Sequence, residues 1–366
     1  MRGVLVCLIW FAIFLVRFSN SFQGEAKLRH LAGEKIVLTG YISSEPILQG
    51  INQKFSLSRI DIVTANQPNY EYGQKVVISG ILQRRVINKW YSQFSLIYPS
   101  IKIIESDNIK SIRYQIIRWR KGIETVFNRN LPEPEASLLA GIILGVKRGL
   151  PQEFYEALKK TSTMHIVVAS GYNVTVIMGV VVAYLAGLAK RKWAILIGVA
   201  AVGIYTVMAG LQPAIVRAAI MGGLAYFGQM LGRPSASWRM LVVAAMVMLI
   251  FDPLIIFDLG FQMSFSATTG LIVLGSKLDK IFGRIWLIGK DLSETTAAQI
   301  FVSPIILSAF GYLSPFSILV NISILWLVPI IMVLGAILAI TRLSLVAWLA
   351  YVPLTIMVRI IEFFNR

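Results

Sequence analysis

Apolar residues recur in long runs through the second half of the chain. Short polar or proline-containing stretches separate the runs, and each run is about as long as a membrane-spanning helix or somewhat shorter. They cover residues 174–188, 193–211, 215–231, 241–251, 261–274, 300–312, 318–340 and 345–364. The pattern predicts a mainly α-helical polytopic membrane protein with about seven to nine transmembrane helices, accompanied by re-entrant or amphipathic helices.

Two further apolar stretches are shorter. Residues 4–16 resemble the apolar part of a signal sequence, but no small-residue cleavage site follows. We therefore expect residues 1–20 to be an uncleaved membrane anchor. The run at 138–144 is too short to cross a bilayer, so we expect a re-entrant or interfacial helix at the start of a polytopic domain spanning residues 136–366.

Residues 24–106 follow a different pattern. Partial alternation of apolar and polar residues at 35–42, 54–63, 75–87 and 94–104, with turn residues between, predicts short β-strands. We expect a small N-terminal all-β domain of the OB type. Its aromatic residues either stack on nucleic-acid bases or belong to the core or a lipid-facing surface. They are Tyr41, Phe55, Tyr70, Tyr72, Trp90, Tyr91 and Phe94.

A basic helix is expected in the connector at residues 107–135. Apolar residues recur there at helical spacing, at Ile112, Ile116, Trp119, Ile123 and Val126. Lysines and arginines occupy much of the remaining surface. Such a helix either lies in the plane of the lipid headgroups or guides DNA, and the sequence leaves both interpretations open.

The distribution of charge predicts an orientation in the membrane. The formal net charge is +17, and only 14% of the residues are charged while 56% are hydrophobic, which excludes an ordinary soluble enzyme. Basic residues follow every second apolar run, whereas the intervening turns contain proline and almost no charge. Basic loops lie in the cytoplasm. This places the β domain and His165 outside, and the total charge favours an anionic partner, either lipid or nucleic acid.

Metal and cofactor chemistry find little support in the composition. Cys7 is the single cysteine, and the two histidines, His30 and His165, lack the spacing of a zinc site. We expect no metal and no cofactor.

The segment from His165 to Asn173 is the most informative one. Its sequence is His-Ile-Val-Val-Ala-Ser-Gly-Tyr-Asn, at the start of an apolar run. Unpaired polar groups in hydrocarbon cost several kcal/mol, about 2–7 on transfer scales, so Ser170, Gly171 and Asn173 indicate a functional site. The alternative is a helix start capped by Ser170 or Asn173.

The same residues carry a resemblance to a known family. The His165-x4-Ser170-Gly171-x-Asn173 pattern resembles a motif of the ComEC competence family, the inner-membrane channel for single-stranded DNA in natural transformation. Further motifs agree in order: residues 139–145, Pro213 to Ala218, and Asp258 to Ser266. The resemblance extends over about residues 135–366.

The resemblance implies a role and a set of site residues. It implies a non-enzymatic, multi-pass protein of the cytoplasmic (inner) membrane that transports DNA. Its partners would be single-stranded DNA, membrane lipids, a cytosolic DNA translocase, DNA-delivery proteins, a separate nuclease and a second copy of the chain. The candidates for the DNA path are His165, Ser170, Gly171, Asn173, Arg217, Asp258, Gln262, Ser264 and Ser266. Arg217 and Asp258 would form an ion pair between helices.

The chain departs from the family pattern in two ways. Asn173 occupies a position where the family commonly has histidine, which removes a protonation role but keeps hydrogen bonding. A metallo-β-lactamase-like domain found in many members is not expected, because no zinc-binding cluster follows. The rival functions are a small-solute or lipid transporter and an intramembrane serine hydrolase that uses Ser170.

Overall fold

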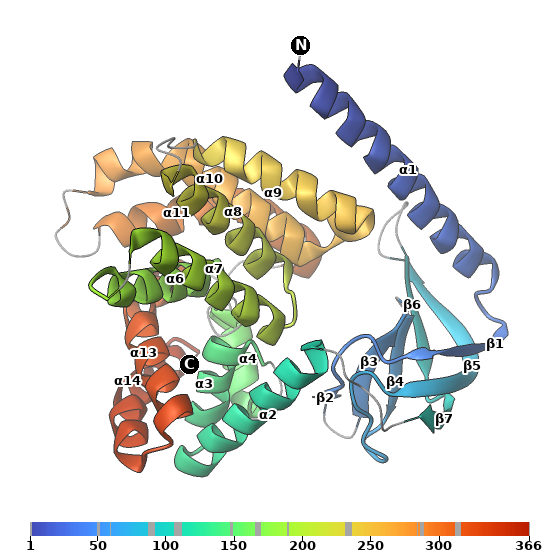
Figure 1. Ribbon diagram of the computed structural model, residues 1–366. Helices are drawn as coiled ribbons and strands as arrows, with labels where there is room; N and C mark the ends of the chain where they lie inside the picture. The colour runs from blue at the N-terminus through green and yellow to red at the C-terminus, as the bar shows by residue number, and fades with distance from the viewer. Residues whose placement is uncertain are drawn as a thin grey trace. The chain divides into compact units, whose positions relative to one another are not determined.

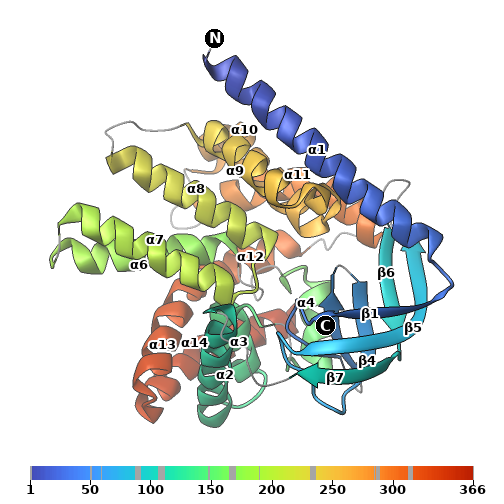
Figure 2. The same ribbon diagram turned by 45° about the vertical axis from the view of Figure 1, so that its right-hand side comes forward.

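The protein divides into two compact units, seen in the computed structural model (Figure 1, Figure 2). The structure describes residues 2–49, 52–58, 60–86, 92–105, 112–146, 149–164, 170–188, 190–230, 236–283, 285, 289–311 and 316–365. The N-terminal unit contains residues 1–118 and 249–257, and the helical unit contains residues 119–248 and 258–366. A mainly helical chain with a small N-terminal β sheet was predicted, and this is confirmed.

The N-terminal unit combines one long helix, α1 (Arg2–His30), with a seven-stranded sheet. The strands are β1 (Lys35–Tyr41), β2 (Ile47–Gln49), β3 (Asn52–Leu57), β4 (Ile60–Ala65), β5 (Lys75–Val86), β6 (Ser92–Ile97) and β7 (Ser100–Glu105). Their order is β1-β5-β6-β4-β3-β2, and β7 pairs with the first half of β5. The 12-residue β5 pairs with β1 through residues 75–81 and with β6 through residues 82–86, so one strand joins both halves of the sheet.

Alternating burial along the strands creates the core of this sheet. On β3, Phe55 and Leu57 point inward, and on β6, Phe94 and Leu96 do the same. Of the aromatic residues considered for base stacking, Phe55, Tyr70 and Phe94 belong to this core, whereas Tyr41 is exposed. Trp90 and Tyr91 lie outside the described residues. The core interpretation therefore holds for three of the seven aromatics.

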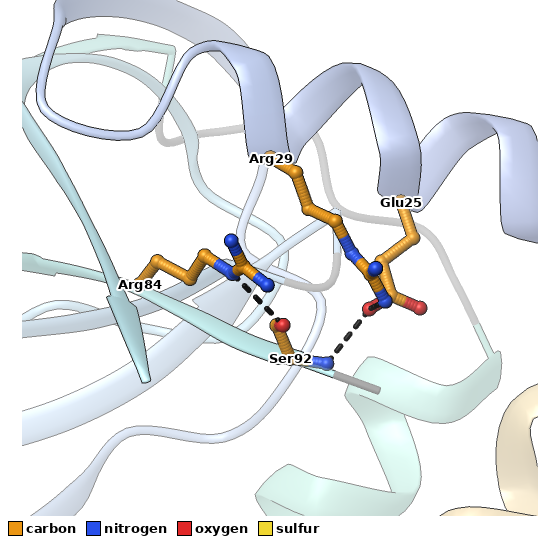
Figure 3. Close-up of polar contacts among 4 residues, drawn as sticks. All are labelled: Glu25, Arg29, Arg84 and Ser92. Carbon is orange, nitrogen blue, oxygen red and sulfur yellow. Dashed lines mark hydrogen bonds and ion pairs between the residues drawn. The ribbon is translucent and has the colours of Figure 1, made fainter. Parts of the chain in front are cut away.

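The C-terminal half of α1 is held on the sheet through a buried carboxylate (Figure 3). Glu25 Oε1 accepts a hydrogen bond from the Ser92 backbone N–H at 2.7 Å and pairs with Arg29 Nη2 at 2.9 Å. Arg84 Nε donates to Ser92 Oγ at 3.0 Å from the neighbouring strand. The first half of α1 instead exposes apolar side chains, as expected of an anchor: Ile9, Phe11, Ile13, Leu15 and Val16.

The helical unit begins within α2 (Ile112–Asn130). The helices that follow are α3 (Glu135–Leu144), α4 (Gln152–Lys160), α6 (Gly171–Ala186), α7 (Arg191–Met208), α8 (Pro213–Met230), α9 (Ser237–Phe251), α10 (Leu259–Phe282), α11 (Gly289–Phe310), α12 (Ser317–Leu325), α13 (Leu327–Thr341) and α14 (Ser344–Phe363). The last turn of α9 and the short 3₁₀ helix η1 (Pro253–Phe257) belong to the N-terminal unit.

By length and composition, a few of these helices are candidate membrane spans. Among the described residues, α7 and α14 are long and apolar enough to cross a bilayer, and α12 with α13 makes a third span if this pair, bent by 46°, counts as one. The count of about seven to nine transmembrane helices that the apolar runs indicate stays a prediction.

Helix α3 is enclosed by protein. Nine of its ten residues are buried, and Ile143 is the exception. A Cβ on Gly335 of α13 would lie 2.6 Å from Leu139 Cδ1, so the two helices approach closely. Thr355 Oγ1 of α14 donates to Glu135 Oε1 at 2.9 Å. An interfacial helix needs a face that is open to the lipid headgroups. Of the two alternatives for residues 138–144, the interfacial helix is therefore wrong.

Helix α2 buries only part of its apolar stripe within the helical unit. Trp119 is 58% exposed, whereas Ile123 and Phe127 are buried together with Arg120. The guanidinium of Arg120 donates to the backbone carbonyl of Met208 at the C-terminal end of α7, where the helix dipole favours a cation. An arginine expected on the polar surface therefore packs inside, because its charge satisfies the end of another helix.

Candidate functional site

The described part of the predicted motif begins at Ser170, because residues 165–169, and with them His165, lie outside the described residues. Ser170 is the N-cap residue of α6, with extended backbone angles of φ −108° and ψ 168°. Its hydroxyl forms no capping bond and instead donates to Asn173 Oδ1 at 3.1 Å. Ser170 is therefore the N-cap residue, as the alternative interpretation expected, but its side chain makes no capping hydrogen bond.

Asn173 is fully buried and joins three helices. Its Nδ2 donates to the Ile142 carbonyl of α3 at 2.8 Å and contacts the Tyr205 hydroxyl of α7 at 3.2 Å. The last carbonyls of a helix have no partner within that helix, so the end of α3 requires an external donor. The amide of Asn173 supplies this donor and fixes the position of α6 against α3 and α7.

The end of α3 is also fitted to the end of α7. Gly145 closes α3 in the left-handed conformation, φ 68°, which favours glycine. A Cβ at this position would lie 3.0 Å from both Cα and Cβ of Ala209. Glycine is therefore required here by backbone conformation and by close packing.

Gly171 lies directly against α8. A Cβ built on Gly171 would lie 2.9 Å from Arg217 Nη2 and 3.3 Å from Ala218 Cβ. Any larger side chain must displace the guanidinium or separate α6 from α8. The glycine of the motif thus makes room for an arginine.

Arg217 connects α8 to α10. Its Nη1 donates to the Ser264 carbonyl at 3.1 Å, while its buried Nε has no hydrogen-bond partner among the residues that the structure describes. Ser264 is nine-tenths buried, and its own hydroxyl is also without a partner. Since Thr268 Oγ1 donates to the same Ser264 carbonyl at 3.0 Å, that oxygen is shared by two donors.

The expected ion pair between Arg217 and Asp258 is wrong. Asp258 is the N-cap of α10, and its Oδ1 accepts a hydrogen bond from the Phe261 backbone N–H at 2.9 Å. No ion pair joins it to Arg217 among the residues that the structure describes. A capping aspartate satisfies the unpaired N–H groups of its own helix, and this local role prevails over a pair across helices.

The remaining polar candidates of α10 lie on another face. Gln262 and Ser266 are partly exposed and are four residues apart, so they share one side of the helix. Ser264 lies between them in sequence and about 160° away around the helix. The structure therefore brings together Ser170, Gly171, Asn173, Arg217 and Ser264, and leaves Asp258, Gln262 and Ser266 apart.

Comparison with known proteins shows the family to which the chain belongs. A family model described as "Competence protein" matches residues 142–366, which is more than half of the chain. The chain belongs to the competence protein family. ComE operon protein 3 of Bacillus subtilis (strain 168) is 24% identical over 252 residues, which are 68% of this chain and 32% of that protein. The chain thus spans about a third of that relative, and no solved structure matches it.

The motifs showed the resemblance to the competence family, but two groups of the site were not predicted, the Tyr205 hydroxyl and the Ile142 carbonyl. Tyr205 interrupts an apolar run and its hydroxyl contacts Asn173. A tyrosine within a membrane-length apolar run is a signal, because its buried hydroxyl requires a partner. The Ile142 carbonyl has no sequence signal beyond its place near the end of a short helix.

The chemistry available at the site is hydrogen bonding and positive charge. Within the described parts of the chain, no group of three or more histidine, cysteine, aspartate or glutamate side chains is arranged to hold a metal. The clustered groups are one guanidinium, one amide and two hydroxyls besides Tyr205. In this competence family member they form an environment that favours an anion over a cation.

Proposed function

We propose that this chain is the channel subunit that carries single-stranded DNA across the cytoplasmic membrane during natural transformation. The observation that carries the proposal is Arg217, a cation set among apolar helices beside the glycine of the motif. An arginine at the centre of a transmembrane helix costs about 2.5–3.5 kcal/mol on insertion scales and less near a helix end, where Arg217 lies, and such residues commonly mark functional sites. Membership of the competence family supports DNA as the anion that is transported.

We propose that the polar contacts of Ser170 serve structure and not hydrolysis. The hydroxyl donates to an amide oxygen, Asn173 Oδ1, which is not a base able to take a proton from a nucleophile. This argues against the serine hydrolase alternative and favours a protein without enzymatic activity. The small-solute or lipid transporter becomes an outcome of the binding test below.

We propose an OB-type barrel for the β domain. The chain just after β1 approaches β3, where the Ser43 N–H donates to the Ser56 carbonyl at 2.9 Å, so the five strands come close to forming a ring. The ring continues through antiparallel β3–β4, parallel β4–β6, antiparallel β6–β5 and antiparallel β5–β1. A partly open five-stranded barrel of this kind supports the OB assignment.

The partners follow from the proposed transport. The chain lacks the residue order of a P-loop, since Gly270-x4-Gly275 is followed by serine and lysine in reverse order. We therefore propose that a cytosolic DNA translocase supplies the energy, that other proteins deliver the DNA, and that a separate nuclease removes the second strand.

The proposed topology makes a direct prediction. In a Cys7→Ser variant, a cysteine introduced at exposed Gln67 of the β domain should react with an impermeant maleimide in intact spheroplasts. A cysteine at Ser237, at the start of α9, should react only after lysis, because basic residues mark that end as cytoplasmic. Labelling of Gln67 only after lysis would contradict the topology.

Binding of DNA by the purified full chain tests the function itself. In dodecyl maltoside, a fluorescein-labelled 20-nucleotide oligodeoxythymidylate should raise its anisotropy as protein is added, and added salt should weaken the binding. Duplex DNA of the same length should bind less well to a path for one strand. Absence of any binding to the oligonucleotide would contradict the proposed function and favour the small-solute or lipid transporter.

A further inference from the structure

Three helices of the helical unit begin at the same place. Arg217 lies in the second turn of α8 and contacts both Gly171, the first residue of α6, and Ser264, in the second turn of α10. The N-terminal end of a helix carries a partial positive charge of about half a unit. None of the three helices has an acidic residue in its first turn. The three helix starts therefore add partial positive charge near Arg217, although Asp258 caps α10. The carboxylates of Asp291 and Glu294 also act on Tyr172, the second residue of α6.

Two buried polar atoms at this convergence have no hydrogen-bond partner within the described parts of the chain. They are Arg217 Nε and Ser264 Oγ, and they belong to residues already joined by the 3.1 Å hydrogen bond between Nη1 and the Ser264 carbonyl. Buried donors without a partner cost about 1–3 kcal/mol each, so native proteins rarely keep them. Both atoms are hydrogen-bond donors on neighbouring side chains, and the described residues offer neither of them an acceptor.

The anion that fits these donors is a phosphate group, whose oxygens accept hydrogen bonds. Arginine offers several N–H groups in one plane, which suits the oxygens of phosphate, and a serine hydroxyl adds a neutral donor. The one carboxylate near the start of α10, Asp258, is engaged by the Phe261 backbone N–H and lies about 120° around the helix from Ser264. It therefore does not neutralise the guanidinium.

We propose that Arg217 Nε and Ser264 Oγ form a subsite for one phosphodiester group of the transported strand, at the end of the bundle where α6, α8 and α10 begin. This proposal rests on the proposed function, because it assigns the substrate phosphate to residues of the same path. Under the topology given above, these helix ends lie on the outer side, so the subsite binds the strand as it enters. Gly171 keeps the space in which the guanidinium lies.

The salt dependence of oligonucleotide binding tests the subsite. In the anisotropy assay, each phosphate neutralised in a single strand contributes about −0.7 to the slope of log affinity against log salt. Arg217→Gln should reduce the slope by about 0.7 and weaken binding about tenfold. Ser264→Ala should weaken binding severalfold with the slope unchanged, since its hydroxyl is neutral. Arg217→Lys should keep the slope and part of the affinity.

A matched arginine controls for net charge. Arg359 is exposed on α14, and Arg359→Gln removes the same charge without touching the three helix ends, so its slope should equal that of the unmodified chain. If Arg217→Gln unfolds the protein, Ser264→Ala and Arg217→Lys still carry the test. Effects of Arg217→Gln and Ser264→Ala that are less than additive in the double variant would support one shared phosphate.

The outcomes separate this subsite from the broader function. Oligonucleotide binding with an unchanged slope in Arg217→Gln would overturn the subsite and leave DNA transport standing, whereas no binding by the unmodified chain would overturn transport. A second arm adds phosphatidylglycerol to the phosphate-free detergent. A rise in thermal midpoint that depends on Arg217, with no change in the DNA slope, would assign the site to a lipid headgroup and contradict the proposal.

Discussion

Replacing Gly171 with leucine is expected to reduce DNA import to background while the protein still accumulates in the membrane. The new side chain must occupy the space in which Arg217 Nη2 lies 2.9 Å from the Cβ position, with Ala218 Cβ at 3.3 Å. The guanidinium is then expelled from the start of α6, or α6 and α8 move apart. DNase-protected label inside cells, measured beside immunoblots of the membrane fraction, checks this result.

A second glycine of the same helix provides the control. Gly179 has no atom within 4 Å of its Cβ position, so Gly179→Leu should import DNA normally. Gly171→Ala should have an intermediate effect, because the end of the arginine side chain is able to shift by a small amount. Normal import by Gly171→Leu would show that the contact between Gly171 and Arg217 is unimportant for transport.

Replacing Asn173 with leucine is expected to destabilise the helical unit. The change leaves the Ile142 carbonyl without its 2.8 Å donor and removes a contact of the Tyr205 hydroxyl. An interhelical hydrogen bond in a membrane is worth about 0.6 kcal/mol on average. Asn173 is fully enclosed and both of these contacts are lost, each worth about 0.5–1.5 kcal/mol, while the Ile142 carbonyl keeps a long hydrogen bond of 3.5 Å from the Tyr205 hydroxyl. The thermal midpoint of the purified chain should fall by several degrees.

The family pattern suggests the rescue of this defect. Asn173→His should retain much of the stability, because an imidazole N–H is also able to donate to a carbonyl. Thr175→Val is the matched control, since Thr175 is exposed on the same helix and its hydroxyl bonds only within α6. A thermal midpoint for Asn173→Leu equal to that of the unmodified chain would mean that the link between α3, α6 and α7 contributes little.

The helices and strands whose apolar residues follow a clear pattern were predictable from the sequence. Alternation placed the first strand at 35–42, against an observed β1 of Lys35–Tyr41, and the apolar run at 193–211 corresponds to α7, Arg191–Met208. The break at Trp326 between α12 and α13 was not predicted, because the residues 318–340 were taken as one apolar run. Pro329, in the first turn of α13, is the sequence signal that could have indicated it.

The sequence predicted which residues belong to the site better than it predicted which groups they contact. Ser170, Gly171 and Asn173 stood out as polar or small residues at the start of an apolar run, and Arg217 stood out by its charge. Their partners depend on tertiary packing: Asn173 pairs with a backbone carbonyl, and Asp258 caps its own helix although an arginine lies on a neighbouring one. A sequence specifies that a polar group needs a partner, but the fold decides which partner it finds.

The path for single-stranded DNA is tested most directly by following labelled DNA into cells. In a transformable strain from which this gene is deleted, DNA should still bind at the surface, DNase-protected label inside should fall to background, and amino-acid uptake should stay normal. A plasmid copy of the chain should restore import. Internal label at the level of the parent strain, or a parallel loss of amino-acid uptake, would contradict the account.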